Sequence, residues 1–216
     1  MIIKVFQLIL FILILAGCVG TGQVRSYLPD KPNVKTKYLF WMHGIRLEDL
    51  GPDHKRVKNY EIIVDTLASN GFYVITEHRE VVIIESYAKI IANQVRELLK
   101  KGVPPVNITV SGYSKGSLIT AAVSSELANP RINYVLVSGC TDRYDLDYSN
   151  VKGRILSIYD KGDEGWFSCA KRINAKDADV EFSEIEILMG KGHKGFRLPK
   201  SKFMDQWQTP LFDWVK

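Results

Sequence analysis

Residues 106–116 read Val-Asn-Ile-Thr-Val-Ser-Gly-Tyr-Ser-Lys-Gly. The first half of this stretch is rich in β-branched residues, which is typical of a buried strand. Residues 117–123, Ser-Leu-Ile-Thr-Ala-Ala-Val, follow directly and favour a helix. Ser114 therefore lies at a sharp turn from a strand into a helix, between Gly112 and Gly116. We expect a side chain at either glycine position to collide with the neighbouring strand or helix.

The pattern Gly-x-Ser-x-Gly at such a turn is typical of a nucleophile elbow. The elbow holds its serine in a strained backbone conformation and keeps the hydroxyl clear of the sheet, where a base can reach it. The helix that follows directs its N-terminal amides at the same point, which suits a developing negative charge. Because five-residue patterns also arise by chance, the alternative is a glycine-rich turn in another kind of α/β protein.

Composition and length indicate one ordinary globular domain. The chain has 216 residues, of which 46% are hydrophobic and 25% charged. Its net charge of +5 comes from dispersed lysines and arginines, without a block of five or more, so a nucleic-acid partner is not indicated.

The N-terminus differs from the rest of the chain. Lys4 precedes an apolar run from Val5 to Leu15 that is too short to span a membrane comfortably and has the layout of a secretory signal. The residues that end this run, Leu15-Ala16-Gly17-Cys18, resemble a bacterial lipobox. That resemblance implies cleavage before Cys18 and lipidation of Cys18. The alternative is an uncleaved anchor helix.

The predicted organisation is a signal peptide over 1–17, a tether over 18–35 and a globular domain over 36–216. The lipid on Cys18 would attach the exported domain to a membrane. Val19 lacks the acidic character of a retention signal. By resemblance to Gram-negative lipoproteins, this implies the periplasmic face of the outer membrane, if the host has one.

Two cysteines remain after Cys18. Export places Cys140 and Cys169 in an oxidising compartment, where they are either disulfide-bonded or two separate buried thiols. Neither has metal-ligand spacing with a histidine, so no metal site is predicted. The glycine-rich residues 190–195 lack a following helix that could hold a phosphate, so no nucleotide cofactor is predicted either.

Alternating elements predict the fold class. Six runs are predicted as strands: 38–42, 72–76, 106–111, 132–137, 154–159 and 182–189. Helical spacing is found between them, and Gly71 and Gly102 are placed to end two of the helices. A short helix is expected over 169–173, and a last helix with Thr209 as its N-cap and Pro210 at its first position. This alternation predicts a doubly wound, mostly parallel sheet flanked by helices.

Chemically suggestive residues lie at the carboxyl ends of the predicted strands, where ligands bind in such sheets. The matches are His43-Gly44 after the first strand, residues 112–116 at the elbow, Asp160-Lys161-Gly162-Asp163 after the fifth and Gly192-His193 after the sixth. In this order the chain resembles the α/β-hydrolase family over about residues 36–216. The resemblance implies Ser114 as nucleophile, His193 as base and Asp163 as the acid that orients it, with Asp160 as the alternative acid.

The resemblance also implies an oxyanion hole formed by the backbone amides of Ile45 and Lys115. The charge of Lys115 either favours an anionic substrate or lies in water at the end of a stem along the helix. His43 is expected to be structural rather than a second base. Tyr113 is expected to pack beside the elbow.

Residues 141–152 leave little room for a cap domain, so an open site is expected. The predicted function is that of a membrane-tethered serine hydrolase of the carboxylesterase, thioesterase or lipase-like type, acting on an unidentified acyl ester or thioester. The alternative is a catalytically inactive relative that binds a lipid or glycan. A monomer is the default expectation.

Overall fold

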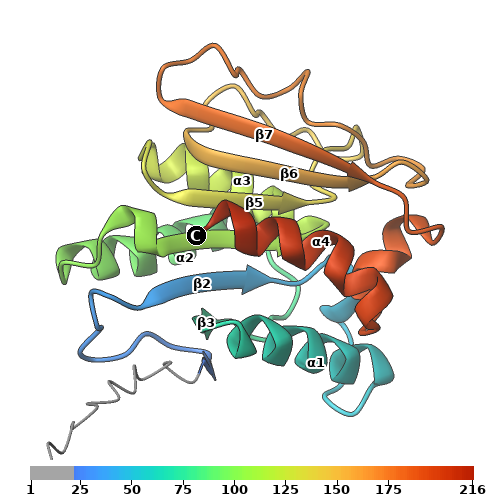
Figure 1. Ribbon diagram of the computed structural model, residues 1–216, viewed down its shortest axis with the longest axis horizontal. Coiled ribbons are helices and arrows are strands. Elements are labelled where there is room, and N and C mark those ends of the chain that lie inside the picture. Colours follow the sequence, from blue (N-terminus) through green and yellow to red (C-terminus); the bar gives the residue numbers. More distant parts are fainter. Residues whose placement is uncertain (1–21) are drawn as a thin grey trace, which may run out of the picture.

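The computed structural model describes residues 22–216, and Figure 1 shows a twisted sheet covered by helices. Every neighbouring pair of strands is parallel, in the order β1-β3-β2-β4-β5-β6-β7. The predicted doubly wound α/β sheet is confirmed. The strands are β1 (Gln23–Arg25), β2 (Lys37–Met42), β3 (Phe72–Ile75), β4 (Ile108–Tyr113), β5 (Asn133–Val137), β6 (Gly153–Asp160) and β7 (Val180–Ile187).

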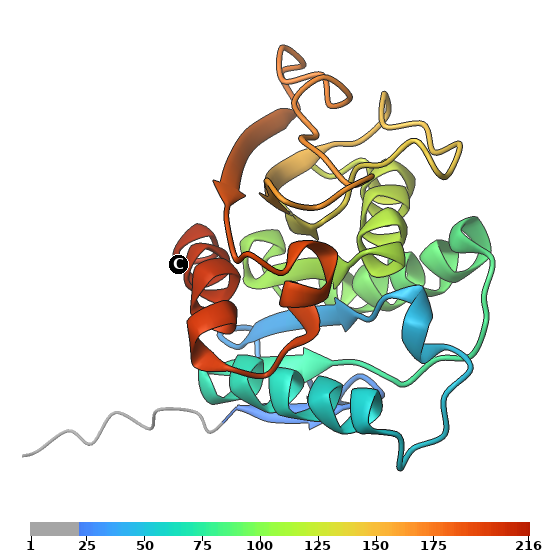
Figure 2. The same ribbon diagram turned by 90° about the vertical axis from the view of Figure 1, so that its right-hand side faces the viewer.

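Helices cover both faces of the sheet, and Figure 2 shows α1 and α4 on one side with α2 and α3 on the other. None of the helices within residues 22–216 has the length and apolar character that crossing a membrane requires. The helices are α1 (Lys55–Ser69), α2 (Ile84–Lys100), α3 (Lys115–Leu127) and α4 (Ser201–Trp214), with the short 3-10 helices η1 (Ile45–Leu47), η2 (Pro105–Asn107) and η3 (Gly192–Arg197).

The continuous apolar run of β2 is explained by burial on both faces. Tyr38 and Phe40 pack in the core beneath α2 and α3, whereas Leu39 and Trp41 pack in the core beneath α1 and α4. Alternate side chains of a strand point to opposite faces, so a central parallel strand needs apolar residues at every position. β7 lies at the edge of the sheet, as its alternating sequence predicts.

The structure corrects the predicted tether. Residues 23–25 form β1, which pairs with Tyr73–Ile75 of β3, so the sheet includes part of the segment 18–35. A three-residue strand is too short to show a period in the sequence, and its partner strand decides its conformation. The predicted signal peptide, Cys18 and Val19 lie outside the described residues.

Two helix predictions were wrong. Pro210 lies inside α4 rather than at its start, and the helix begins eight residues before Thr209. Residues 169–173 form turns and no helix. In α4, Phe203 and Trp207 are buried, and Trp207 stacks on Trp41 with ring centroids 5.2 Å apart. This packing stabilises the helix before Pro210, and the fully buried Leu211 stabilises it after Pro210, although the proline disfavours helix locally.

Candidate active site

The turn between β4 and α3 has the geometry expected of a nucleophile elbow. Ser114 has φ 58° and ψ −123°, a conformation that residues with side chains rarely adopt. A Cβ at Gly112 would lie 2.4 Å from the carbonyl carbon of Gly116, and a Cβ at Gly116 would lie 2.1 Å from the oxygen of Met42. Both approaches are too close for any side chain, so glycine is required at each position, as predicted.

Three side chains from distant parts of the chain meet at the carboxyl end of the sheet. The Oγ of Ser114 lies 3.0 Å from Nε2 of His193, and Nδ1 of His193 lies 2.7 Å from Oδ2 of Asp163. A neutral imidazole with its proton on Nδ1 donates to the carboxylate and accepts the serine proton at Nε2. Ser114 is 4% exposed, and the arrangement can support nucleophilic attack by its oxygen.

The structure distinguishes the two candidate acids. Asp160 accepts hydrogen bonds of 2.7 Å from the backbone amides of Gly162 and Met189, one on each carboxylate oxygen, so it shapes the turn. Asp163 contacts His193 and is therefore the acid of this constellation.

The predicted oxyanion amides lie on two segments that meet at Ser114. Lys115 is the first residue of α3, and Ile45 is the first residue of η1 in the loop after β2. Neither amide donates a hydrogen bond to any residue in 22–216. Both donors are therefore available to a negative oxygen formed beside Ser114, and the positive end of α3 reinforces them.

Comparison with solved structures identifies the fold. SOBER1 from Arabidopsis thaliana is 14% identical and matches with a TM-score of 0.52, covering 83% of this chain and 97% of that one. XC6422 from Xanthomonas campestris, described as an α/β serine hydrolase without lid, is 14% identical with a TM-score of 0.51, covering 88% and 84%. The chain has the α/β-hydrolase fold.

A phospholipase/carboxylesterase from Dyadobacter fermentans shares this α/β-hydrolase fold, at 12% identity and a TM-score of 0.53, covering 86% of this chain and 93% of that one. No protein-family model matches the chain, and no curated protein matches it in sequence.

A second serine, Ser138, contacts Asp163. The Oγ of Ser138, at the carboxyl end of β5, donates a 2.7 Å hydrogen bond to Oδ2 of Asp163, the same oxygen that faces His193. Ser138 has φ 50°, so strained backbone directs its side chain into the site. Ser138 was not predicted as a site residue, although it directly follows a predicted strand.

Aromatic side chains hold the imidazole between them. The ring of Trp166 stacks on His193 at 21°, and the ring of Tyr113 lies on it at 35°, each with centroids 4.8 Å apart. The hydroxyl of Tyr113 also donates a 2.6 Å hydrogen bond to the backbone oxygen of His193. These contacts fix His193 within η3. Trp166 was not predicted, because no sequence period links it to His193.

A buried charge network joins the two oxyanion segments. Glu48, which follows η1, accepts from Nζ of Lys115 at 2.8 Å and from Arg79 at 3.1 Å, and its side chain is 0% exposed. Both interpretations of Lys115 in the sequence analysis were therefore wrong, because its ammonium is neither in water nor free for a substrate. Glu48 ties the loop of Ile45 to the N-terminus of α3.

His43 completes this network as a neutral group. Its Nε2 accepts from the amide of Arg79 at 3.0 Å, and its Nδ1 lies 2.9 Å from the oxygen of Gly44. Burial, and then the charge of Arg79, lower the pKa of His43 to about 3. Burial also lowers the pKa of Arg79. His43 is structural, as predicted.

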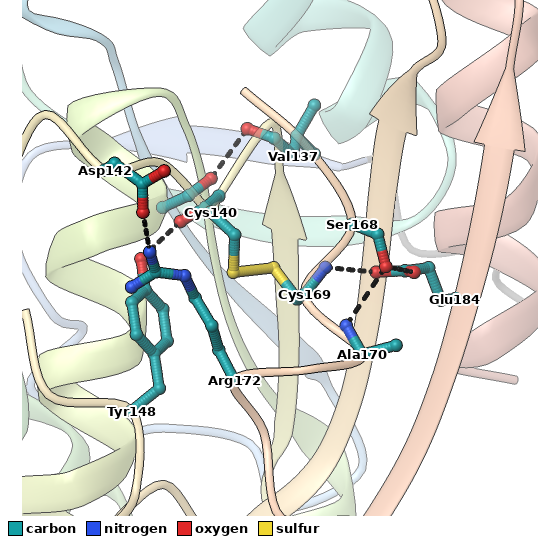
Figure 3. Close-up of a disulfide and its surroundings, with 11 residues drawn as sticks. Val137, Cys140, Asp142, Tyr148, Ser168, Cys169, Ala170, Arg172 and Glu184 are labelled. Carbon is teal, nitrogen blue, oxygen red and sulfur yellow. Dashed lines mark hydrogen bonds and ion pairs between the residues drawn. A yellow bond between two sulfur atoms is a disulfide. The ribbon is translucent and has the colours of Figure 1, made fainter. Parts of the chain in front are cut away.

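Figure 3 shows the disulfide between Cys140 and Cys169, so of the two alternatives for these cysteines the bonded one is confirmed. The bridge joins the segment after β5 to the segment that leads into β7, and Cys140 also pairs in an antiparallel bridge with Phe167. The amide of Cys169 donates a 2.7 Å hydrogen bond to Glu184 of β7. Trp166 and Asp163 thus lie in a loop that the disulfide closes.

Within residues 22–216, no three histidine, cysteine, aspartate or glutamate side chains are grouped so as to hold a metal ion. A cleft of about 520 Å³ opens in front of Ser114 and His193.

Proposed function

We propose that this protein is a serine hydrolase that cleaves an acyl ester or thioester through an acyl-enzyme. The observation that supports this proposal is the contact of Ser114 Oγ with His193 Nε2 at 3.0 Å, on an imidazole held by Asp163. The amides of Ile45 and Lys115 and the strained backbone of Ser114 add further support. Backbone strain of this kind is found mainly at functional sites.

The geometry supports a two-step reaction. Ser114 Oγ attacks the carbonyl carbon as His193 takes its proton, and the amides of Ile45 and Lys115 stabilise the oxyanion. His193 then gives the proton to the leaving alcohol or thiol, and the acyl group remains on Ser114. Water, deprotonated by His193, then attacks the acyl-enzyme, and His193 returns the proton to Ser114 Oγ as the acid leaves. Asp163 stabilises the imidazolium in both steps.

The structural neighbours support an ester substrate. One is named a phospholipase/carboxylesterase, and Est1E from Butyrivibrio proteoclasticus, which is 13% identical with a TM-score of 0.50, has been solved with ferulic acid. These names describe those proteins.

The test is labelling with a fluorophosphonate, which reacts with an activated serine. The wild type should be labelled, and Ser114→Ala should abolish the labelling. Ser149→Ala, in the exposed loop before β6, is the matched control and should be labelled like the wild type. Labelling that survives in Ser114→Ala would refute the assignment. Absence of both labelling and turnover in a folded wild type would instead favour the inactive module that binds a lipid or glycan.

We also propose that the domain is tethered to a membrane through a lipid on Cys18 after removal of residues 1–17. The lipobox-like end of the apolar run supports this. Mass spectrometry of the mature protein should find a lipidated Cys18 at its N-terminus, and Cys18→Ser should move the protein from the membrane fraction to the soluble one. A mature chain that retains Met1 would contradict it.

A further inference from the structure

Arginines dominate the cleft in front of Ser114. Its lining contains one carboxylate, Asp49, and the four arginines Arg46, Arg56, Arg143 and Arg197. They come from η1, α1, the loop after β5 and η3, so they approach the nucleophile from separate elements.

A second, apolar pocket of about 580 Å³ adjoins the cleft. Trp41, Ile63 and Phe196 contribute to its walls, and Arg56 and Arg197 line both spaces. Three lysines also line this pocket, and no carboxylate does: Lys55, Lys191 and Lys194.

These basic side chains lack carboxylate partners. Within residues 22–216, lysine and arginine form nine ion pairs, and none of the nine involves the seven basic residues of the two spaces. The two spaces are lined by seven basic side chains and one carboxylate, Asp49. Their excess of positive charge is therefore larger than the net charge of +5 of the whole chain. The positive charge of the protein is therefore concentrated around the nucleophile.

Mutual repulsion accompanies this concentration. Arg197 is half-buried, and burial lowers its pKa, with the nearby charges of Arg56 and Arg46 adding to the effect. Like charges held together without counter-charges destabilise a protein unless a ligand neutralises them. Guanidinium groups match the oxygen geometry of carboxylate and phosphate.

We propose that Arg46, Arg56 and Arg197 bind a carboxylate or phosphate group carried by the ester that Ser114 attacks, while the apolar pocket holds a hydrocarbon part of the same molecule. This proposal rests on the proposed hydrolase function and names its substrate class, an anionic acyl ester. The charge can lie on the acyl side or on the leaving-group side of the scissile bond, and the experiment has one arm for each.

The acyl arm compares the mono-4-nitrophenyl ester of glutaric acid with its methyl ester, which has the same chain without the charge. The leaving-group arm compares 4-acetoxybenzoate with its methyl ester. The measured quantity is the ratio of kcat/KM for the charged substrate to kcat/KM for the neutral one, with the full-length protein in neutral detergent. Because each variant is compared with the wild type, the intrinsic reactivities of the substrates cancel.

The variants are Arg46→Gln, Arg56→Gln and Arg197→Gln. Each should lower the ratio about tenfold in the arm that carries the recognised charge, because it removes a charge-assisted hydrogen bond. The matched control is Arg131→Gln, an exposed arginine that precedes β5 at the opposite end of the strands, and it should leave the ratio unchanged. Added salt should lower the ratio of kcat/KM values in the wild type. It should leave that ratio unchanged in a variant that carries all three substitutions.

Equal losses for charged and neutral esters, or a ratio unchanged by all three substitutions, would overturn the proposal while leaving the hydrolase function intact. If the wild type cleaves no ester, the hydrolase function fails instead. Calorimetric binding of the charged glutarate ester to Ser114→Ala, with and without Arg197→Gln, then tests the arginines alone. If Arg197→Gln does not weaken this binding, the proposed role of the arginines is refuted.

Discussion

The two halves of the site are held by different forces. The half on the sheet, Ser114 with the amide of Lys115, is fixed by backbone contacts and by the buried carboxylate of Glu48. The half on loops, His193 with Asp163, is fixed by stacked rings, hydrogen bonds and a nearby disulfide. The first half is built from the central strand β4 and helix α3, whereas the second is built from the segments that follow β6 and β7. Damage to the contacts that hold the first half, such as those of Glu48, should appear mainly as lost stability. Damage to the catalytic side chains of the second half should appear mainly as lost activity.

The largest expected effect tests the loop half. His193→Ala should lower kcat by roughly 10⁴–10⁶-fold, because Ser114 loses its base. The free energy of unfolding should fall by only about 1 kcal/mol, since the ring is partly exposed and Trp166 and Tyr113, which stack on it, keep their other core contacts. Ester hydrolysis and urea denaturation measure the two quantities. An unfolded His193→Ala variant would break the comparison.

Glu48→Gln tests the sheet half. The neutral amide leaves the charges of Arg79 and Lys115 buried without a counter-charge, so the free energy of unfolding should fall by about 3–5 kcal/mol. The matched control is Glu126→Gln, whose ion pair with Arg96 is exposed, and it should cost less than about 1 kcal/mol. The free energies of unfolding are measured by urea denaturation. If Glu48→Gln and Glu126→Gln lower them equally, burial of the network adds nothing to stability.

The disulfide between Cys140 and Cys169 is the main contribution of the loop half to the stability of the protein. Replacing Cys140 and Cys169 together by serine should lower the free energy of unfolding by about 3–4 kcal/mol, given their sequence separation of 29. A reducing agent should produce the same loss in the wild type and none in the double variant. A wild-type melting temperature that does not respond to reduction would contradict this.

Acid should weaken the sheet half through His43. Its pKa is about 3 in the folded protein and 6.5 in the unfolded chain, so the unfolded chain binds the extra proton between these values. The stabilisation is complete above pH 6.5 and is lost as pH falls, by about 2 kcal/mol between pH 6.5 and 5. In NMR spectra, the ring signals of His43 should not titrate between pH 5 and 8. A midpoint near 6.5 would contradict the burial argument.

The smallest expected effect concerns Ser138. Ser138→Ala removes one of the hydrogen bonds that orient Asp163 and should lower kcat/KM about tenfold, with little loss of stability. Ser149→Ala serves as the control. Wild-type activity in Ser138→Ala would show that His193 alone is enough to orient the acid.

The sheet half is where sequence-based prediction succeeded. The β-branched run, the two glycines and Ser114 lie within eleven residues, and steric exclusion at the glycines acts locally. Central strands were predicted because burial on both faces demands apolar residues throughout. β1 and the start of α4 were missed because distant packing decides them.

The loop half was only partly predictable. His193 and Asp163 could be placed by their order after the strands, but the contacts that hold them could not. Ser138 and Trp166 reach the site only when β5, β6 and η3 are assembled, and no local pattern records that approach. Glu48 was missed for the same reason, because its partners Arg79 and Lys115 are 31 and 67 residues away.

The wholly parallel sheet has a kinetic consequence. No two adjacent strands can be joined by a tight hairpin, so every pairing must wait for a long stretch of chain to be organised. Pairing of β2 with β4, for example, brings Tyr38 to Ile108. Ordering of this kind makes folding slow. We expect the newly made polypeptide to remain open for longer than a helical bundle of equal length, which would suit the export proposed from its N-terminal sequence.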